Sequence, residues 1–341
     1  MNFLNNRINI LINTDIFLSH HYHIYFEKRS HNRIIRAYEV DNSKKREHIK
    51  STLGEFFERE VLINSNSMKD TSKKMTSLID GNEKNVPLSE LVFIDNFVDS
   101  CGMASHVHSE NVIWNAYKEF FERQSFIANF LFHLPAYEIE IEKYEKLMKV
   151  HQYILNYLDE IKYYNISLSK EIFVTLAIGW SDRNKAAGLG TSRNIFNSIE
   201  KAQKEILQYF AVSKSKRNFV REKTSIQNYD LYHLNFEKMS VTKFKQEYEY
   251  LLESQKRIIL RKNQLGNQKK IIINNYKILN MNPYISVFSQ RETQGIKVVK
   301  IKDDFWFPHM YPLMFEKEKI EILEKTFGWK RKNFSKLLPF A

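Results

Sequence analysis

The pattern of apolar and polar residues predicts short strands and helices that alternate along the chain. Residues 22–26 and 33–40 predict two strands, and turn-forming Asp, Asn and Ser follow them. From about residue 47 to 61 the apolar positions repeat with the period of a helix, so they share one face. Residues 64–90 are polar and rich in Ser, Asn and Lys, which favours a mobile loop. Residues 90–98 then predict a strand.

The second part of the chain predicts longer elements. Residues 109–130 and 140–162 predict helices, and 171–182 is a nearly continuous apolar run, typical of a strand buried on both faces. The glycine-containing segment 185–194 is expected to be a loop, and 194–212 a helix. The remaining expectations are a loop at 99–111, mostly helical charged residues at 215–275, and late strands at 283–290 and 295–301.

The chain contains no linker long or flexible enough to require a domain boundary. We therefore predict one domain over residues 1–341. Residues 1–32 are assigned to an N-terminal extension of this domain.

Composition limits the class of protein. The 341 residues are 43% hydrophobic, which is ample for a core, while only 9 Gly and 6 Pro argue against a disordered or fibrous chain. The net charge of +12 favours an anionic partner, but the basic residues are dispersed, which argues against nucleic acid. The single cysteine, Cys101, fits a reducing compartment. Without an apolar run of membrane-spanning length or a signal peptide, we expect a soluble cytoplasmic protein.

The pentapeptide EFFER occurs twice, at residues 55–59 and 119–123. On a helix, residues i, i+3 and i+4 project from one side, so the charged residues of each copy stand together while the Phe pair faces the core. A third predicted helix carries a related set at i, i+4 and i+7. The three sets are Glu55, Glu58 and Arg59; Glu119, Glu122 and Arg123; and Lys201, Glu205 and Gln208.

Three such helices around one cavity would bring five carboxylates together. Like charges at that density require cations, and Mg²⁺ takes oxygen ligands and is commonly shared with phosphates. Arg59, Arg123 and Lys201 would then contact the phosphates. The alternative is that the helices expose these faces to solvent, with Glu/Arg pairs worth only about a few tenths of a kcal/mol each. The repeat and the third set argue against that alternative.

These residues, in this order, resemble the YcaO family of ATP-dependent enzymes that modify backbone amides of peptides. The resemblance runs from about Arg33 to the C-terminus. A motif similar to SxxxExxER begins at Ser51, and one similar to SxGxA followed by ExxER begins at Ser100. Residues 198–208, SIEKAQKEILQ, resemble the family's ALxRALxExxQ with Lys in the Arg place. The ending LLPFA is similar to the proline-rich tail of azoline-forming members, and the chain looks closest to the heterocyclase subunits of microcin-type clusters.

The resemblance implies a mixed α/β fold, with helices packed on mainly antiparallel sheet and the nucleotide held between the three carboxylate-bearing helices. ATP and Mg²⁺ are the implied cofactors. The acidic residue expected eight positions before Glu119 falls on Asn111, with Glu110 beside it. The implied metal ligands are Glu55, Glu58, Glu110, Asn111, Glu119, Glu122 and Glu205. The implied nucleotide and phosphate contacts are Ser51, Glu55, Arg59, Ser100, Arg123, Lys201 and Gln208.

The implied reaction is a cyclodehydration in the biosynthesis of a ribosomal peptide such as a bacteriocin. A Cys, Ser or Thr side chain attacks the preceding backbone carbonyl, ATP phosphorylates the oxygen, and loss of phosphate leaves a thiazoline or oxazoline. Arg59, Arg123 and Lys201 are the implied catalytic cations, and Pro339 and Ala341 of the tail complete the site.

The resemblance also implies partners. A chain of this size relies on a partner subunit that binds the leader of the precursor peptide, and a flavin-dependent dehydrogenase commonly acts on the product. Thioamide or amidine formation by the same activation is one alternative. A non-catalytic scaffold subunit of a peptide-modifying complex is another, and substitution of the acidic ligand by Asn111 favours it.

Overall fold

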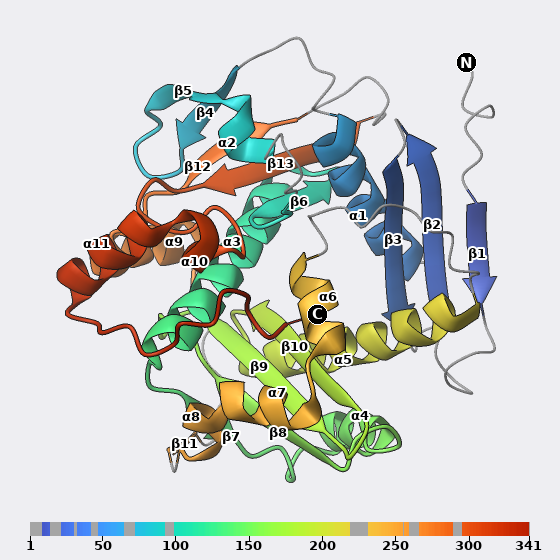
Figure 1. Ribbon diagram of the computed structural model, residues 1–341. Coiled ribbons are helices and arrows are strands. Elements are labelled where there is room, and N and C mark those ends of the chain that lie inside the picture. The colour runs from blue at the N-terminus through green and yellow to red at the C-terminus, as the bar shows by residue number, and fades with distance from the viewer. Residues whose placement is uncertain are drawn as a thin grey trace.

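The strands form three sheets, and one long helix lies between the two larger sheets (Figure 1). The sheets are mainly antiparallel, which confirms the predicted mixed α/β class. The protein is represented by a computed structural model. It describes residues 9–13, 22–30, 33–41, 47–64, 72–92, 99–218, 231–254, 256–258, 266–288 and 295–340.

The first sheet is antiparallel, in the order β1-β2-β3, and two helices contact its strand β3. The predicted strands at 22–26 and 33–40 are confirmed, and β1 and β2 lie in the segment assigned to an N-terminal extension. The helices predicted at 47–61 and 194–212 are also confirmed and run further than expected. The bounds are β1 (Asn9–Asn13), β2 (Tyr22–Ser30), β3 (Arg33–Asp41), α1 (Glu47–Asn64) and α5 (Ile195–Asn218).

The second sheet has the order β10-β9-β8-β7-β11 and is covered on one side by α5. Strand β9 is buried at every position, as the apolar run at 171–182 predicts. The loop expected at 185–194 is wrong, because residues 185–192 pair along their whole length with β9. The helix expected at 140–162 is also too long: it ends at Ile154, and β8 follows because it pairs with β9. The bounds are β7 (Tyr137–Ile139), α4 (Glu145–Ile154), β8 (Glu160–Asn165), β9 (Phe173–Trp180), β10 (Lys185–Ser192) and β11 (Arg257–Ile258).

The third sheet has the order β5-β4-β12-β13-β6 and is antiparallel throughout. It corrects the mobile loop expected at 64–90, since the β4–β5 hairpin buries Met75 and Val86 in a small apolar cluster. Residues 90–92 end a short helix where a strand was expected, and 93–98 lie outside the described residues. The bounds are β4 (Ser72–Ser77), β5 (Glu83–Pro87), α2 (Leu88–Val92), β6 (Met103–His106), β12 (Tyr284–Val287) and β13 (Lys297–Lys302).

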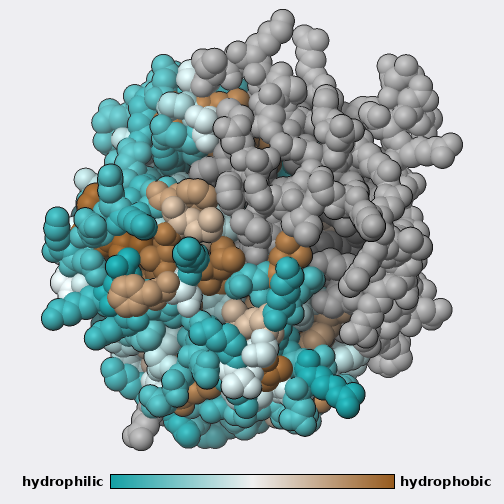
Figure 2. Space-filling view, in the orientation of Figure 1, coloured by the Kyte–Doolittle hydropathy of each residue, from teal (hydrophilic) through white to brown (hydrophobic). Residues whose placement is uncertain are grey.

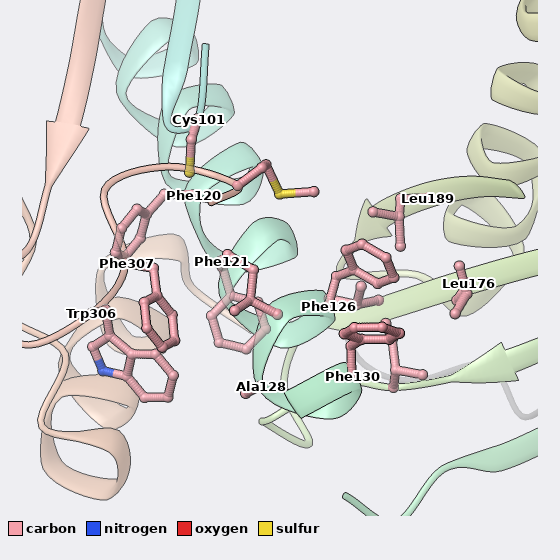
Figure 3. Close-up of a cluster of buried hydrophobic side chains, with 14 of the residues drawn as sticks. Cys101, Phe120, Phe121, Phe126, Ala128, Phe130, Leu176, Leu189, Trp306 and Phe307 are labelled. Carbon is pink, nitrogen blue, oxygen red and sulfur yellow. The ribbon is translucent and has the colours of Figure 1, made fainter. Parts of the chain in front are cut away.

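Helix α3 (Ser109–Phe132) is the central element, and it confirms the helix predicted at 109–130. Its aromatic side chains are at most 7% exposed, and burial of each contributes about 1.5–3 kcal/mol to folding. Figure 3 shows Phe120 on the side of Cys101 and Phe307, and Phe126 on the side of Leu189 of β10. One core cluster therefore extends from the third sheet through α3 to the second sheet.

The other helices and the C-terminal segment cover the ends of these layers. Figure 2 shows a mostly hydrophilic surface on which apolar residues gather over the last two helices, where Met314, Phe315 and Ile322 are exposed. Among the described residues, no helix is long and apolar enough to cross a membrane. The remaining bounds are α6 (Leu231–Lys238), α7 (Val241–Glu247), α8 (Glu249–Leu252), α9 (Gln268–Leu279), α10 (Pro312–Phe315) and α11 (Lys317–Phe327).

Two glycines of β10 allow α5 to lie directly on the sheet. A side-chain carbon at Gly188 would lie 2.2 Å from the carbonyl oxygen of Ala202, and one at Gly190 would lie 2.1 Å from the carbonyl oxygen of Ser198. Both neighbours are helix backbone, which cannot move aside. The glycines of the GLG sequence therefore set the height of α5 above β10 and do not form a phosphate-binding loop.

We predict that Gly190→Ala destabilises the protein by about 1–3 kcal/mol or more, because α5 must move away from β10. Gly266→Ala is the matched control, since a side-chain carbon there meets Ile271 at an ordinary 3.6 Å. Urea unfolding measures both variants. Equal midpoints for the two would contradict the role of Gly190.

Candidate active site

Helix α1 places Glu55, Glu58 and Arg59 on one side, as the i, i+3, i+4 spacing requires. Nη2 of Arg59 lies 2.6 Å from Oε1 of Glu55. Glu58 accepts hydrogen bonds from Ser105 of β6. The helix approaches β6 closely at Gly54, where a side-chain carbon would lie 2.5 Å from Oγ of Ser105. The absence of a side chain at Gly54 therefore lets Glu58 reach β6.

Helix α3 repeats this arrangement from its buried position. Nε of Arg123 donates to Oε1 of Glu119 at 3.0 Å. The carboxylate of Glu122 is only 6% exposed and accepts a hydrogen bond from Oγ1 of Thr191 in β10 at 2.7 Å. The second copy of EFFER thus faces β10, while its two phenylalanines anchor the helix in the core.

Helix α5 adds the third set. The backbone N–H of Leu189 in β10 donates to Oε2 of Glu205 at 2.7 Å. Nζ of Lys201 donates to the carbonyl oxygen of Thr191 at 3.1 Å. Because Thr191 also holds Glu122, the end of β10 joins the polar side chains of α3 and α5.

The carboxylates influence one another across the three helices. Burial, together with the charges of Glu55 and Glu119, raises the pKa of Glu58 to about 8. Burial and the charge of Glu122 raise the pKa of Glu205 to about 8. Burial and Glu119 also raise the pKa of Glu122. The five carboxylates therefore form one electrostatic chain that runs from α1 through α3 to α5.

This donor set fits a divalent cation. Carboxylate oxygens are the ligands that Mg²⁺ prefers, and a bound cation would relieve the charge crowding that raises these pKa values. Within the described ranges, no three His, Cys, Asp or Glu side chains lie close enough to form a preformed metal cage. The carboxylates are held separately, by Arg59, Arg123, Ser105, Thr191 and Leu189, so a cation would bind between groups that are already partnered.

Two cations beside Lys201 were not identified from the sequence. Burial and the charge of Lys201 lower the pKa of Lys118 on α3 to about 7, with a smaller contribution from Arg193. The Arg193 guanidinium lies 5.7 Å from the ring centre of Trp114. Such a group of positive side chains suits a phosphate. The signal in the sequence was the position of Lys118 four residues before Glu122, which places both on one helix face.

The C-terminal segment also reaches the site, beside Arg123 of α3. Oη of the buried Tyr248 donates to the carbonyl oxygen of the buried Pro339 at 2.9 Å. The ring of Phe340 packs against Phe126 with 5.3 Å between ring centres, and the guanidinium of Arg123 lies 5.3 Å from the Phe340 ring centre. The tail thus lies beside a cation of the carboxylate chain. Ala341 lies outside the described residues.

The other predicted site residues lie at the edges of this region. Ser51 is exposed on α1, Ser100 is exposed in the turn before β6, and Gln208 is half-buried on the turn of α5 that follows Glu205. Glu110 and Asn111 are exposed in the first turn of α3. Neither takes part in the contacts described for the five carboxylates.

We predict that Glu58→Gln stabilises the metal-free protein at high pH. The folded protein keeps the Glu58 proton up to about pH 8, whereas the unfolded chain releases it near the ordinary glutamate pKa of 4.5. Between pH 4.5 and about pH 8 the folded state therefore binds more protons than the unfolded state. The stability of the folded protein falls as the pH rises through this range. Because Gln cannot ionise, the variant should be more stable at about pH 8 by roughly 1 kcal/mol or more. Urea unfolding in a chelator at about pH 5 and about pH 8 measures this.

The matched control is Glu318→Gln on α11, where the carboxylate is exposed. Its stability should follow that of the unchanged protein at both pH values. An identical pH dependence in the unchanged protein and in Glu58→Gln would show that Glu58 is ionised in the folded state, contrary to its half-buried position beside Glu55 and Glu119.

Several solved structures share this fold at low sequence identity. A chain of the E. coli microcin synthetase McbBCD complex is 15% identical with a TM-score of 0.72, and the match covers 92% of each chain. YcaO from Methanopyrus kandleri bound with AMPPCP and Mg²⁺ is 12% identical with a TM-score of 0.68, covering 87% of this chain and 84% of that chain. A heterocyclase in complex with substrate and cofactor has the same identity and TM-score, covering 97% of this chain and 54% of that one. At these identities the likeness shows the fold.

No curated protein sequence matches the chain. The sequence model of the family described as YcaO cyclodehydratase, ATP- and Mg²⁺-binding, matches residues 51–302. This range begins at Ser51 and contains the charged positions of α1, α3 and α5. It also spans well over half of the 341 residues. The chain therefore belongs to the YcaO family.

Proposed function

We propose that the protein is an ATP-dependent cyclodehydratase subunit, which converts Cys, Ser or Thr of a ribosomal precursor peptide into a thiazoline or oxazoline. The observation that carries this proposal is the chain of five carboxylates across α1, α3 and α5, with arginine and lysine side chains among them. An arrangement of this kind suits a nucleoside triphosphate with its divalent cations.

Relatives of the same fold support the choice of ligands. The Methanopyrus kandleri YcaO is bound with AMPPCP and Mg²⁺, and a heterocyclase is in complex with substrate and cofactor. The microcin synthetase McbBCD complex has pro-MccB17 bound. We extend to this chain the nucleotide, the magnesium and the peptide substrate of these proteins.

The residues of the site divide into three roles. The metal ligands would be Glu55, Glu58, Glu119, Glu122 and Glu205, with Glu110 and Asn111 as further candidates at the start of α3. Arg59, Arg123 and Lys201 would contact phosphates, and Ser51, Ser100 and Gln208 would seat the nucleotide. Mg²⁺, when bound, supplies neutralisation of phosphate charge and orientation of the phosphates.

The chemistry explains why phosphate-binding cations are required. In the reaction, a thiol or hydroxyl of the peptide loses its proton and attacks the preceding carbonyl carbon, and the resulting oxyanion accepts the terminal phosphoryl group of ATP, which releases ADP. The carbon–oxygen bond then breaks, phosphate leaves, and the amide nitrogen loses its proton to give the C=N bond of the azoline. An amide oxygen leaves poorly until it is phosphorylated, so the protein's part is to hold the two substrates in place and to offset the negative charge.

Lys118 and Arg193 extend this positive region. They lie beside Lys201 on the side of the site formed by α3 and the start of α5. We assign them, with Lys201, to the part of the site that contacts phosphate. The tail residues Pro339 and Ala341 would complete the site.

The subunit would work in a complex. The E. coli microcin synthetase is a complex, McbBCD, and it has pro-MccB17 bound. We propose a partner subunit that binds the leader peptide and a flavin-dependent dehydrogenase that oxidises the ring. Thioamide or amidine formation would use the same activation of the amide oxygen by another nucleophile.

We predict that the protein binds ATP only with Mg²⁺, and that Glu119→Ala weakens this binding by at least about tenfold, because Glu119 adjoins both Glu58 and Glu122. Calorimetric titration with AMPPCP, with and without Mg²⁺, measures it. Mass spectrometry of a precursor peptide encoded nearby then tests for loss of water in the presence of the partner subunits.

The matched control is Glu142→Gln, a substitution at an exposed carboxylate outside the site. It should bind the nucleotide as the unchanged protein does. Failure of the unchanged protein to bind AMPPCP, even with its partners present, would refute the proposed enzyme. It would favour the scaffold subunit that the Asn111 substitution suggests.

We predict that Phe340→Leu lowers the rate of peptide dehydration about two- to fivefold, because the cation–π contact with Arg123 is lost while apolar packing on Phe126 remains. Rate measurements at saturating ATP test this. Phe334→Leu, at an exposed position of the same segment, is the control. Equal rates for both variants would exclude a role of the Phe340 ring.

A further inference from the structure

A buried lysine lies beneath the turn that carries Ser100. Lys300 of β13 is 1% exposed, and its Nζ donates to the carbonyl oxygens of Asp99 at 2.9 Å and of Cys101 at 3.0 Å. Burial lowers its pKa. A lysine is rarely buried to this extent unless its charge is paired, because removal of the ammonium from water costs on the order of several kcal/mol. The contacts of Lys300 with the turn are therefore expected to have a structural or functional role.

Asp99, whose backbone carbonyl accepts from Lys300, is itself 6% exposed. One carboxylate oxygen of Asp99 accepts from the backbone N–H of Cys101 at 2.7 Å, and the other accepts from the backbone N–H of Met310 at 3.0 Å. Lys300 and Asp99 together therefore hold the backbone of the turn from two sides. They also join the turn to the segment that follows β13.

The backbone conformation of the turn is restricted. The N–H of Met103 donates to the carbonyl oxygen of Ser100 at 2.8 Å, and Gly102 has a φ of +70°. A side-chain carbon at Gly102 would lie 2.8 Å from the carbonyl oxygen of Ile301, so another residue would be excluded by space as well as by conformation. The exposed Ser100 is consequently presented at a fixed position.

The turn packs on the part of α3 that carries the site. Gln124 fixes the adjoining segment, with Nε2 donating to the carbonyl oxygen of Phe307 at 2.8 Å and Oε1 accepting from its N–H at 2.9 Å. The charge of Glu119 acts on both Lys300 and Cys101, and Arg123 acts on Cys101. The hydrogen bonds of Lys300 described above go to the Ser100 turn and not to the five carboxylates. Lys300 can therefore act on the site through this turn.

We infer that Lys300, together with Asp99, is a positioning residue that holds the Ser100 turn against α3 so that the turn can contact a nucleotide phosphate. This inference rests on the proposed function for the identity of the ligand. Its structural part, the fixing of the turn by Lys300, is independent of that function.

Lys302 provides a matched comparison. It lies two residues away on the same strand, is 8% exposed, and pairs with Glu90 of α2, away from the Ser100 turn. Substitution of either lysine by methionine keeps an unbranched side chain that is one atom shorter and removes the charge. Only Lys300→Met removes the donor from the two carbonyl oxygens of the turn.

The experiment compares Lys300→Met, Lys302→Met and Lys300→Arg with the unchanged protein in three measurements: amide hydrogen exchange, thermal unfolding, and titration with AMPPCP and Mg²⁺. We expect Lys300→Met to speed exchange at Cys101, Met103 and Met310 at least about tenfold and to weaken AMPPCP binding at least about fivefold. Lys302→Met should leave both within about twofold, whatever its effect on thermal stability. Lys300→Arg should restore part of the binding, because its guanidinium can donate to the same carbonyl oxygens.

The outcomes separate the two proposals. Faster exchange in Lys300→Met with unchanged AMPPCP affinity would overturn the positioning role, and so would unchanged exchange. If the unchanged protein binds no AMPPCP, the proposed function fails, and exchange alone decides whether Lys300 fixes the turn. Should Lys300→Met not fold, Asp99→Asn replaces it: one oxygen can still accept from Cys101, but the N–H of Met310 then meets an amide NH₂ group in place of a carboxylate oxygen. The same two readouts then apply.

Discussion

The burial of negative charge between α1, α3 and α5 is the constraint on which the rest of the structure depends. Carboxylates that shift one another's pKa upward are unfavourable for folding, so they persist only where surrounding structure holds them. Apolar packing supplies this support: α3 is buried along nearly all its length between two sheets. Hydrogen bonds from Ser105, Thr191 and the backbone of Leu189 fix the individual carboxylates. Stability and ligand binding therefore make opposite demands on the same side chains.

Strands as well as helices determine the geometry of the site. The end of β10 contacts Glu122, Glu205 and Lys201 together, and its glycines bring α5 down onto the sheet. On the opposite side, β6 meets α1 at Gly54 and leads from the turn beneath which Lys300 lies. The helices carry the charged groups, while the two strands set the distances between them. Substitutions in these strands would thus alter the site without removing any charged residue.

The repeated EFFER segment was enough to predict which side chains share a helix face, because helical spacing is a local property. The mixed α/β class followed from the family resemblance, which the order of the motifs carries. Sequence reasoning failed where pairing decided the structure. The polar 72–87 segment forms a hairpin because Met75 and Val86 meet an apolar cluster, and the 185–192 segment is a strand because it pairs with β9. Thr191 and Lys300 had no recognisable spacing, since their partners are remote in the chain.

The contact between Phe340 and Arg123 joins two residues separated by most of the chain. During synthesis, α1 and α3 leave the ribosome long before β10, α5 and the tail, and domains complete their structure only when the last contacting segment is available. Until then Glu122 lacks Thr191, and Arg123 lacks the Phe340 ring. A nascent chain thus carries the charged residues of both EFFER segments without the arrangement that brings them together. Translation itself delays the assembly of the site until almost the whole sequence has been made.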